Sequence, residues 1–230
     1  KAMGTQQLQA LPSQAFAGMT QQQMGALPPA AIKTLNSTDV KALAPQAFNG
    51  MTAQQVQNLD PKAVAGMGAQ QFSQLPPEAL KAMGTQQLQA LPSQAFAGMT
   101  PQQLGQLPTT ALKTLDANDV KALPAEALTS LSAKQVQAID PKAIKSFDAA
   151  KVQSLPTTAV AALQPDQLKS LSKDAFAGMT TEQLSALKTT QAKSLTVDQL
   201  KALTPTQVAS IPKDVINSMT SAQKAALPKG

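Results

Sequence analysis

The chain has 230 residues and a net charge of +6, from 19 lysines and 13 acidic residues, and it contains no cysteine, histidine, arginine, tryptophan or tyrosine. These absences exclude disulfides and thiol nucleophiles, and they remove the commonest metal ligand and the side chains that dominate binding hot spots. Because lysine lacks the bidentate fork that reads phosphate or guanine, the charge does not favour nucleic acid as a partner, and no apolar run is long enough to predict membrane insertion.

The chain divides into octads, units of eight residues that run from Gly4 to Leu227 without insertion or deletion. In chain order the first four read GTQQLQAL, PSQAFAGM, TQQQMGAL and PPAAIKTL. Position eight is apolar in every octad, and position five in all but two, which hold Ala192 and Lys224. All 17 prolines fall at position one or two, and the methionines and phenylalanines fall at position five or eight. This periodicity predicts a single repeat array over residues 1–230.

The residue types at each position predict one short helix per octad. Position one often carries an N-cap residue, and a Gln three residues later completes a capping box, as in Thr52 with Gln55. Proline is tolerated in a first turn, while acids in positions one to four and lysine at position six suit the helix dipole. Glycine at position seven, as in Gly18 and Gly98, should loosen the last turn. The predicted N-caps are Thr20, Thr52, Asp60, Thr100, Asp116, Ser132, Thr180 and Thr204.

Two other architectures are disfavoured. In one long helix an octad spans about 2.2 turns, so an apolar stripe would rotate by roughly 80° per octad, and the recurring prolines would break the helix. A β-solenoid needs alternating apolar residues, whereas the apolar spacing here is three and then five. Two apolar side chains per octad cannot offset the entropy of ordering eight residues, so neighbouring helices must share a core.

A second period of sixteen residues is superposed on the octads. Because a small residue lets helices approach whereas Gln or a charge needs water, alternate helices should have different surroundings. We therefore expect an all-α solenoid or superhelix of about 28 very short helices, paired into 16-residue helix-turn-helix units. Gln at position four (Gln7, Gln23, Gln55, Gln71, Gln87, Gln103, Gln135) alternates with Ala (Ala15, Ala31, Ala47, Ala63, Ala79, Ala95, Ala111, Ala127, Ala143), and Asp39, Asp119 and Lys151 replace some of the glutamines.

A longer repeat is also present, since residues 1–20 and 81–100 are identical in sequence. It indicates either duplication of a gene segment or a superhelical turn completed by ten octads. Both ends of the chain lie inside an octad, so we interpret the chain as a fragment of a longer array. Lys224, at a core position of the last full octad, is alternatively the mark of a C-terminal cap.

Few groups suggest chemistry. Asp116 with Asp119 could hold a cation, but the other oxygen ligands of a calcium loop are missing, so capping is favoured. The hydroxyls have no histidine to activate them. We expect no catalytic, cofactor-binding or metal-binding residues, no cofactor and no enzyme activity. The Met, Phe and Leu stripe could form a groove but is favoured as core. The position-six lysines could form a basic ridge toward an acidic polysaccharide, DNA or a membrane surface, but a solvated face is favoured; they include Lys33, Lys41, Lys113, Lys121 and Lys201.

Octads such as MTPQQLGQL at Met99 to Leu107 and LTPTQVASI at Leu203 to Ile211 resemble arrays in very large secreted or surface proteins of bacteria, including adhesin-like and haemagglutinin-like ones. The resemblance covers the whole chain. It implies a non-catalytic stalk, spacer or adhesive array at the bacterial cell surface or outside the cell. The alternative is an interaction module that binds a protein, a glycan or a second copy of the chain. The sequence leaves the partner unknown.

Overall fold

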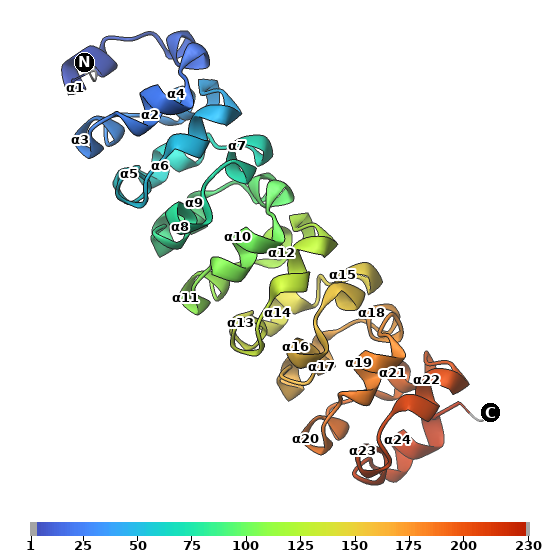
Figure 1. Ribbon diagram of the computed structural model, residues 1–230. Helices are drawn as coiled ribbons and strands as arrows, with labels where there is room; N and C mark the ends of the chain where they lie inside the picture. Colours follow the sequence, from blue (N-terminus) through green and yellow to red (C-terminus); the bar gives the residue numbers. More distant parts are fainter. Residues whose placement is uncertain (1–3, 229–230) are drawn as a thin grey trace. The chain divides into compact units, whose positions relative to one another are not determined.

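The computed structural model describes residues 4–228, which form 28 helical segments and no strand (Figure 1). Four of the segments, η1 to η4, are 3-10 helices and the others are α-helices. Every helix lies inside one octad, so the predicted all-α array of very short helices is confirmed. Within residues 4–228, no helix has both the length and the apolar character needed to span a membrane.

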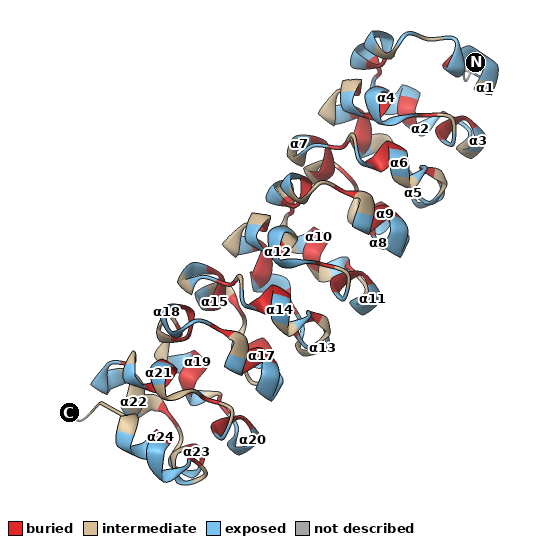
Figure 2. Cartoon of the chain, turned by 180° about the vertical axis from the view of Figure 1, so that it is seen from behind, coloured by how far each residue is buried: buried red, intermediate tan, exposed pale blue. Residues whose placement is uncertain are grey.

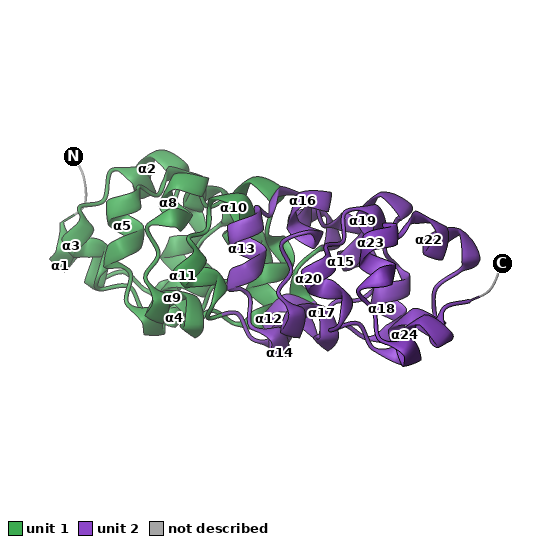
Figure 3. Ribbon diagram, turned by 90° about the horizontal axis from the view of Figure 1, so that it is seen from below, with its two compact units in different colours: residues 1–114, 122–124 green, residues 115–121, 125–230 purple. Residues whose placement is uncertain are grey.

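Two compact units divide the described residues: 4–114 with 122–124, and 115–121 with 125–228 (Figure 3). In the first unit the helices form three stacks. The first stack is α1 (Thr5–Gln9), α3 (Pro29–Ile32), α5 (Ala53–Asn58), α8 (Pro77–Lys81) and α10 (Pro101–Gln106). The second is η1 (Ser13–Gly18), α4 (Ser37–Ala42), α6 (Pro61–Val64), α9 (Thr85–Ala90) and α11 (Thr109–Leu112). The third is α2 (Gln21–Gly25), η2 (Pro45–Gly50), α7 (Ala69–Ser73) and η3 (Ser93–Gly98).

The second unit is built in the same way. One stack is η4 (Ala125–Ser130), α15 (Ala149–Ser154), α18 (Lys173–Ala177), α21 (Val197–Lys201) and α24 (Ser221–Ala226). Another is α13 (Ala133–Ala138), α16 (Thr157–Val160), α19 (Thr181–Ser185) and α22 (Pro205–Ser210). A third is α14 (Pro141–Ile144), α17 (Pro165–Ser170), α20 (Thr189–Ala192) and α23 (Lys213–Asn217). The remaining helix, α12 (Ala117–Ala122), includes the point in the sequence where the units divide.

In both units a helix packs on the helix three octads away, so one turn of the coil takes three octads. The predicted pairing into 16-residue helix-turn-helix units is therefore wrong. The alternation of Gln and Ala that suggested it marks no difference in burial, because Gln55 and Ala63 are exposed by only 2% and 1%. Ten octads do not complete a turn either, and the identical α1 and α9 lie in different stacks.

The core consists of positions four, five and eight, as predicted for the Met, Phe and Leu stripe (Figure 2). Position four faces the preceding turn, because Gln7 and Ala15 in the first turn are exposed whereas the later position-four residues from Ala31 on are buried, except Asp119 and Gln207, which are half-buried. Position five faces the following turn, since Lys224 in the last turn is exposed and Val208 is half-buried. Each turn is thus covered on both sides by its neighbours within a unit.

The eight predicted N-caps are confirmed. Each accepts a backbone N–H with its side-chain oxygen, for example Thr52 from Gln55 at 3.2 Å and Asp60 from Lys62 at 2.7 Å. Four of the position-seven glycines, Gly50, Gly66, Gly98 and Gly178, have a role that the sequence did not predict, because a Cβ there would collide with the preceding turn. A Cβ at Gly98 would overlap the Ala69 carbonyl oxygen of the preceding turn, so glycine lets η3 approach α7 closely.

Gly98→Ala and Gly18→Ala test this approach in two copies of one local sequence. Because a packed backbone must move aside, we expect Gly98→Ala to lower the free energy of unfolding by about 1–3 kcal/mol. Nothing lies within 4 Å of a Cβ at Gly18, so Gly18→Ala should be neutral or slightly stabilising. Urea denaturation followed by circular dichroism measures both variants. Equal effects would contradict the packing of η3 on α7.

Candidate functional site

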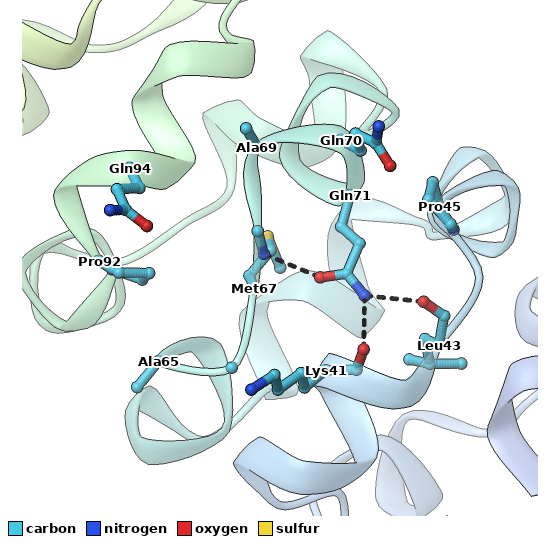
Figure 4. Close-up of a pocket in the computed structure, with 12 residues that line it drawn as sticks. Lys41, Leu43, Pro45, Ala65, Met67, Ala69, Gln70, Gln71, Pro92 and Gln94 are labelled. Atoms are coloured by element: carbon cyan, nitrogen blue, oxygen red, sulfur yellow. Dashed lines mark hydrogen bonds between the residues drawn. The ribbon is translucent and has the colours of Figure 1, made fainter. Parts of the chain in front are cut away.

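Most of the buried polar side chains of the coil are glutamines at position four, shown for Gln71 in Figure 4. Its Oε1 accepts the backbone N–H of Gly68 at 2.8 Å, which caps the start of α7. Its Nε2 donates to the carbonyl oxygens of Val40 at 2.8 Å and Leu43 at 2.7 Å. One buried amide therefore serves the start of its own helix and the end of α4, four octads earlier.

This arrangement, which we call the glutamine clamp, recurs in both units. The acceptors lie 31 and 28 residues before the glutamine, at distances of 2.6–3.0 Å. The expectation that Gln at position four needs water is wrong, because the protein backbone satisfies both ends of the amide. The clamps are made by Gln55, Gln71, Gln87, Gln103, Gln167, Gln183, Gln191, Gln199 and Gln223.

Sequence reasoning identified the capping-box half of the clamp and missed the other half. A signal was present: position four precedes the buried position five and lies four residues before the buried position eight, so it falls on the apolar face of the helix. A glutamine held on that face must find acceptors for its two N–H groups, and the nearest free acceptors are the last carbonyls of another short helix.

A cleft of about 600 Å³ opens beside this clamp in the first unit (Figure 4). It is lined by the ends of α4 and α6 and by the starts of η2, α7 and η3. Equivalent positions form a cleft of about 370 Å³ sixteen residues further on, at Gln57 to Gln87, and one of about 400 Å³ in the second unit, at Ala133 to Gln191. The cleft therefore belongs to the helix junction and recurs with the repeat.

The cleft offers hydrogen bonding and little else. Lys41 is its charged residue, and the polar atoms of Gln71 are already engaged in the clamp. Gln70 and Gln94 reach it from two successive turns (Figure 4). Such a surface can bind a neutral ligand through amides, and none of the groups lining it forms a paired acid and base.

The residues singled out for cation binding cap a helix instead. Asp116 Oδ1 accepts the backbone N–H groups of Asn118 at 2.7 Å and Asp119 at 2.9 Å, and Asp119 Oδ2 accepts that of Asp116 at 3.1 Å. The capping interpretation is confirmed. Among residues 4–228 no three Asp or Glu side chains gather at a place that could hold a metal ion.

The position-six lysines are exposed, as a solvated face requires. Lys33, Lys41 and Lys113 belong to helices of the first unit, in which α3 lies in a different stack from α4 and α11. In the second unit Lys145, Lys169 and Lys193 occupy one stack, α14, α17 and α20, with Asp166 three residues before Lys169 on the same helix. Acids lie among these lysines, which agrees with the solvated face that the sequence favours over a basic ridge.

Lys151 replaces the clamp glutamine in α15 and is buried. Its Nζ lies 3.5 Å from Asp148 Oδ2, the one ion pair within residues 4–228. The backbone N–H of Lys151 donates to Asp148 Oδ1 at 2.8 Å and lowers the pKa of that carboxyl below its ordinary value. The charge of the Lys151 ammonium lowers it further, while partial burial opposes the shift.

The fold and its repeating clamps define the class of the protein: it is a tandem-repeat array of short helices. A family model for the ALTTAQ repeat matches residues 160–197 and 176–212, and residues 186–191 read ALKTTQ. Both matches lie in the second unit and together cover less than half of the chain, so the chain is similar to this repeat there. The two matches begin 16 residues apart, which agrees with the sequence period of two octads. No curated protein matches the sequence.

Gln87→Ala tests the clamp, and Gln7→Ala is its control in identical local sequence. Gln87 donates to Val56 and Leu59, whereas Gln7 is exposed and its Nε2 makes no hydrogen bond within residues 4–228. Because Gln87→Ala strands a backbone N–H and two carbonyls, we expect a loss of about 2–4 kcal/mol in the free energy of unfolding. Gln7→Ala should cost less than about 0.5 kcal/mol.

Gln87→Glu separates the two halves of the clamp in the same denaturation experiment. It keeps the acceptor for the Gly84 N–H but replaces the donor with a carboxylate that faces two carbonyl oxygens. We expect it to be at least as destabilising as Gln87→Ala at pH 7. Equal stability of Gln87→Glu and the wild type would contradict the clamp.

The lowered pKa of Asp148 predicts a pH dependence of stability. Since the folded pKa lies below the unfolded one, the stabilisation is fully present above about pH 4 and is lost as the pH falls through the folded pKa. Asp148→Asn should therefore be less stable than the wild type at pH 7, and the difference should shrink at about pH 2–3. The effect is modest because the Asp148 side chain is 62% exposed. Thermal unfolding at both pH values measures it, and a difference that is unchanged with pH would refute it.

Proposed function

We propose that the chain is a non-catalytic structural scaffold, a spacer or stalk within a large extracellular or surface protein of bacteria. The single observation that carries the proposal is the glutamine clamp, which recurs in both units and binds the backbone of an earlier turn. The most buried polar groups are thereby used to hold the coil together. A repeat protein whose function depends on length and stiffness requires such bonds between its turns.

The regular construction supports a spacer in a second way. Every octad offers the same two faces, position four toward the preceding turn and position five toward the following one. Stability in such an array is a sum over neighbours, so turns can be added without redesign of the core. The reach of a spacer would then scale with the number of octads.

A second candidate function is an interaction module that binds a protein or a glycan. The observation that favours it is the recurring cleft at the helix junctions, where Gln70 and Gln94 expose amides that make no hydrogen bond within residues 4–228 (Figure 4). Repetition of a weak site along an array gives avidity without a deep pocket.

Two deletions in the first unit test the spacer. Removal of residues 60–83, one full turn, keeps the octad phase and the stacks, so the protein should stay folded and its maximum dimension should fall by roughly 8–10 Å, the spacing of packed helices. Removal of residues 60–71 is smaller but shifts Phe72 from position five to position one. This variant should lose helicity or unfold at a markedly lower temperature.

Circular dichroism and small-angle X-ray scattering give the two readouts. If the 12-residue deletion were tolerated as well as the 24-residue deletion, the phased coil would not be the basis of function. If the 24-residue deletion left the maximum dimension unchanged, the spacer function would be wrong.

A further inference from the structure

One side of the first unit carries no charge. The four octads that form the stack of α2, η2, α7 and η3 are residues 20–27, 44–51, 68–75 and 92–99, and none of them contains Asp, Glu or Lys. The other two stacks of this unit hold Lys33, Asp39, Lys41, Asp60, Lys62, Glu78, Lys81 and Lys113. We call the uncharged stack the glutamine side.

Glutamine recurs once per turn on the outer surface of this side. Gln22, Gln46, Gln70 and Gln94 occupy position three of four successive stacked helices and are 24 residues apart. All four side chains are exposed, and within residues 4–228 their amides make no hydrogen bond. The other two stacks of the unit have no such series, because Ala30, Glu78, Thr38, Lys62 and Thr110 interrupt them.

The geometry allows one ligand to contact several of these amides. Gln70 and Gln94 line one cleft of about 600 Å³ from two successive turns (Figure 4). On the same side Asn49 Nδ2 donates to Gln74 Oε1 at 2.7 Å, so amides of adjacent turns are within reach of each other. Ala65, Gly66 and Ala69 leave the floor of the cleft open.

We propose that the glutamine side binds a neutral polysaccharide lengthwise, through hydrogen bonds between the position-three amides and sugar hydroxyls. This inference rests on the second candidate function, the interaction module, and does not depend on the spacer function. Each amide donates and accepts, as each hydroxyl does, so neighbouring hydroxyls can be bound in pairs. A charged polymer finds no counter-charge on the four octads, with Lys41 at the rim of the cleft.

The period of the glutamines favours a polysaccharide over a polypeptide. Packed helices are roughly 8–10 Å apart, so the amides should recur at about that distance. An extended strand repeats its same-face residues every ~6.6 Å and would drift out of register within a few turns. A polyproline helix repeats every ~9 Å, but its recognition uses aromatic-lined grooves. The phenylalanines of this side, including Phe48, Phe72 and Phe96, are fully buried.

Affinity electrophoresis tests the proposal with the whole chain. Native gels run toward the cathode would contain dextran, galactomannan or hydroxyethyl cellulose, and the mobility would be compared with that in a plain gel. The test variant carries Gln22→Ala, Gln46→Ala, Gln70→Ala and Gln94→Ala. The control variant carries the same change at exposed position-three glutamines of the other stacks, Gln6→Ala, Gln14→Ala, Gln54→Ala and Gln102→Ala.

We expect at least one neutral polysaccharide to retard the wild type and the control alike, and the test variant to lose most of that retardation, a several-fold drop in affinity. Circular dichroism should show unchanged helicity, because alanine is a good helix former on an exposed surface. Three results would overturn the proposal: no retardation in any neutral gel, equal loss in both variants, or retardation by alginate alone, which would point to the lysines. Displacement by polyproline and not by a soluble oligosaccharide would identify a polypeptide ligand and also refute it.

Failure of this experiment is distinguishable from failure of the spacer function. The deletions measure stability and length in the absence of any ligand, whereas the gels measure retention of intact protein by a polymer.

Discussion

A helix of four to six residues is almost entirely made of ends, and the capping of those ends is the constraint on which this coil depends. The first four N–H groups and the last four carbonyls of any α-helix lack partners within it, so a helix this short satisfies few of its own groups. It is also far below the length at which isolated helices persist in water. The glutamine clamp meets both problems, because one amide accepts a hydrogen bond at the start of its own helix and donates to two terminal carbonyls of an earlier helix.

The clamp also explains why a polar residue belongs in the core. Gln55, Gln103 and Gln199 are exposed by no more than 2%, comparable with the apolar residues that follow them at position five. A buried amide with every donor and acceptor engaged costs little, and an incomplete one costs much. The geometry of the clamp thus fixes the register of the turns more strictly than apolar contacts could, since apolar packing tolerates sliding and a hydrogen bond does not.

The first unit uses glutamine in two opposite ways, according to its position in the octad. At position four the amide is buried and hydrogen-bonded to the backbone, whereas at position three on the glutamine side it is exposed and makes no hydrogen bond within residues 4–228. The same residue type therefore joins the turns at one position and offers donors and acceptors to solvent at the other. The change from three to four moves the side chain by about 100° around the helix, which is enough to take it from solvent to the interface between turns.

The duplicated segment separates the features that the local sequence determines from those that depend on neighbouring turns. Residues 1–20 and 81–100 are identical, and both form an α-helix followed by a 3-10 helix with the same capping box. Yet Gln7 and Ala15 are exposed, whereas Gln87 and Ala95 are buried by the turn that precedes them. Caps, helix boundaries and the apolar positions depend on residues within one octad, so the sequence by itself determined them.

The number of octads per turn, the partners of the clamp and the side on which the position-three glutamines align were decided only by the tertiary structure. They depend on contacts between residues 24 to 31 positions apart, which lie in different octads. A period of sixteen in the sequence suggested pairs of helices. In the structure the helices pack three octads to a turn, and both a hydrogen-bonded glutamine and an alanine are buried at position four between successive turns.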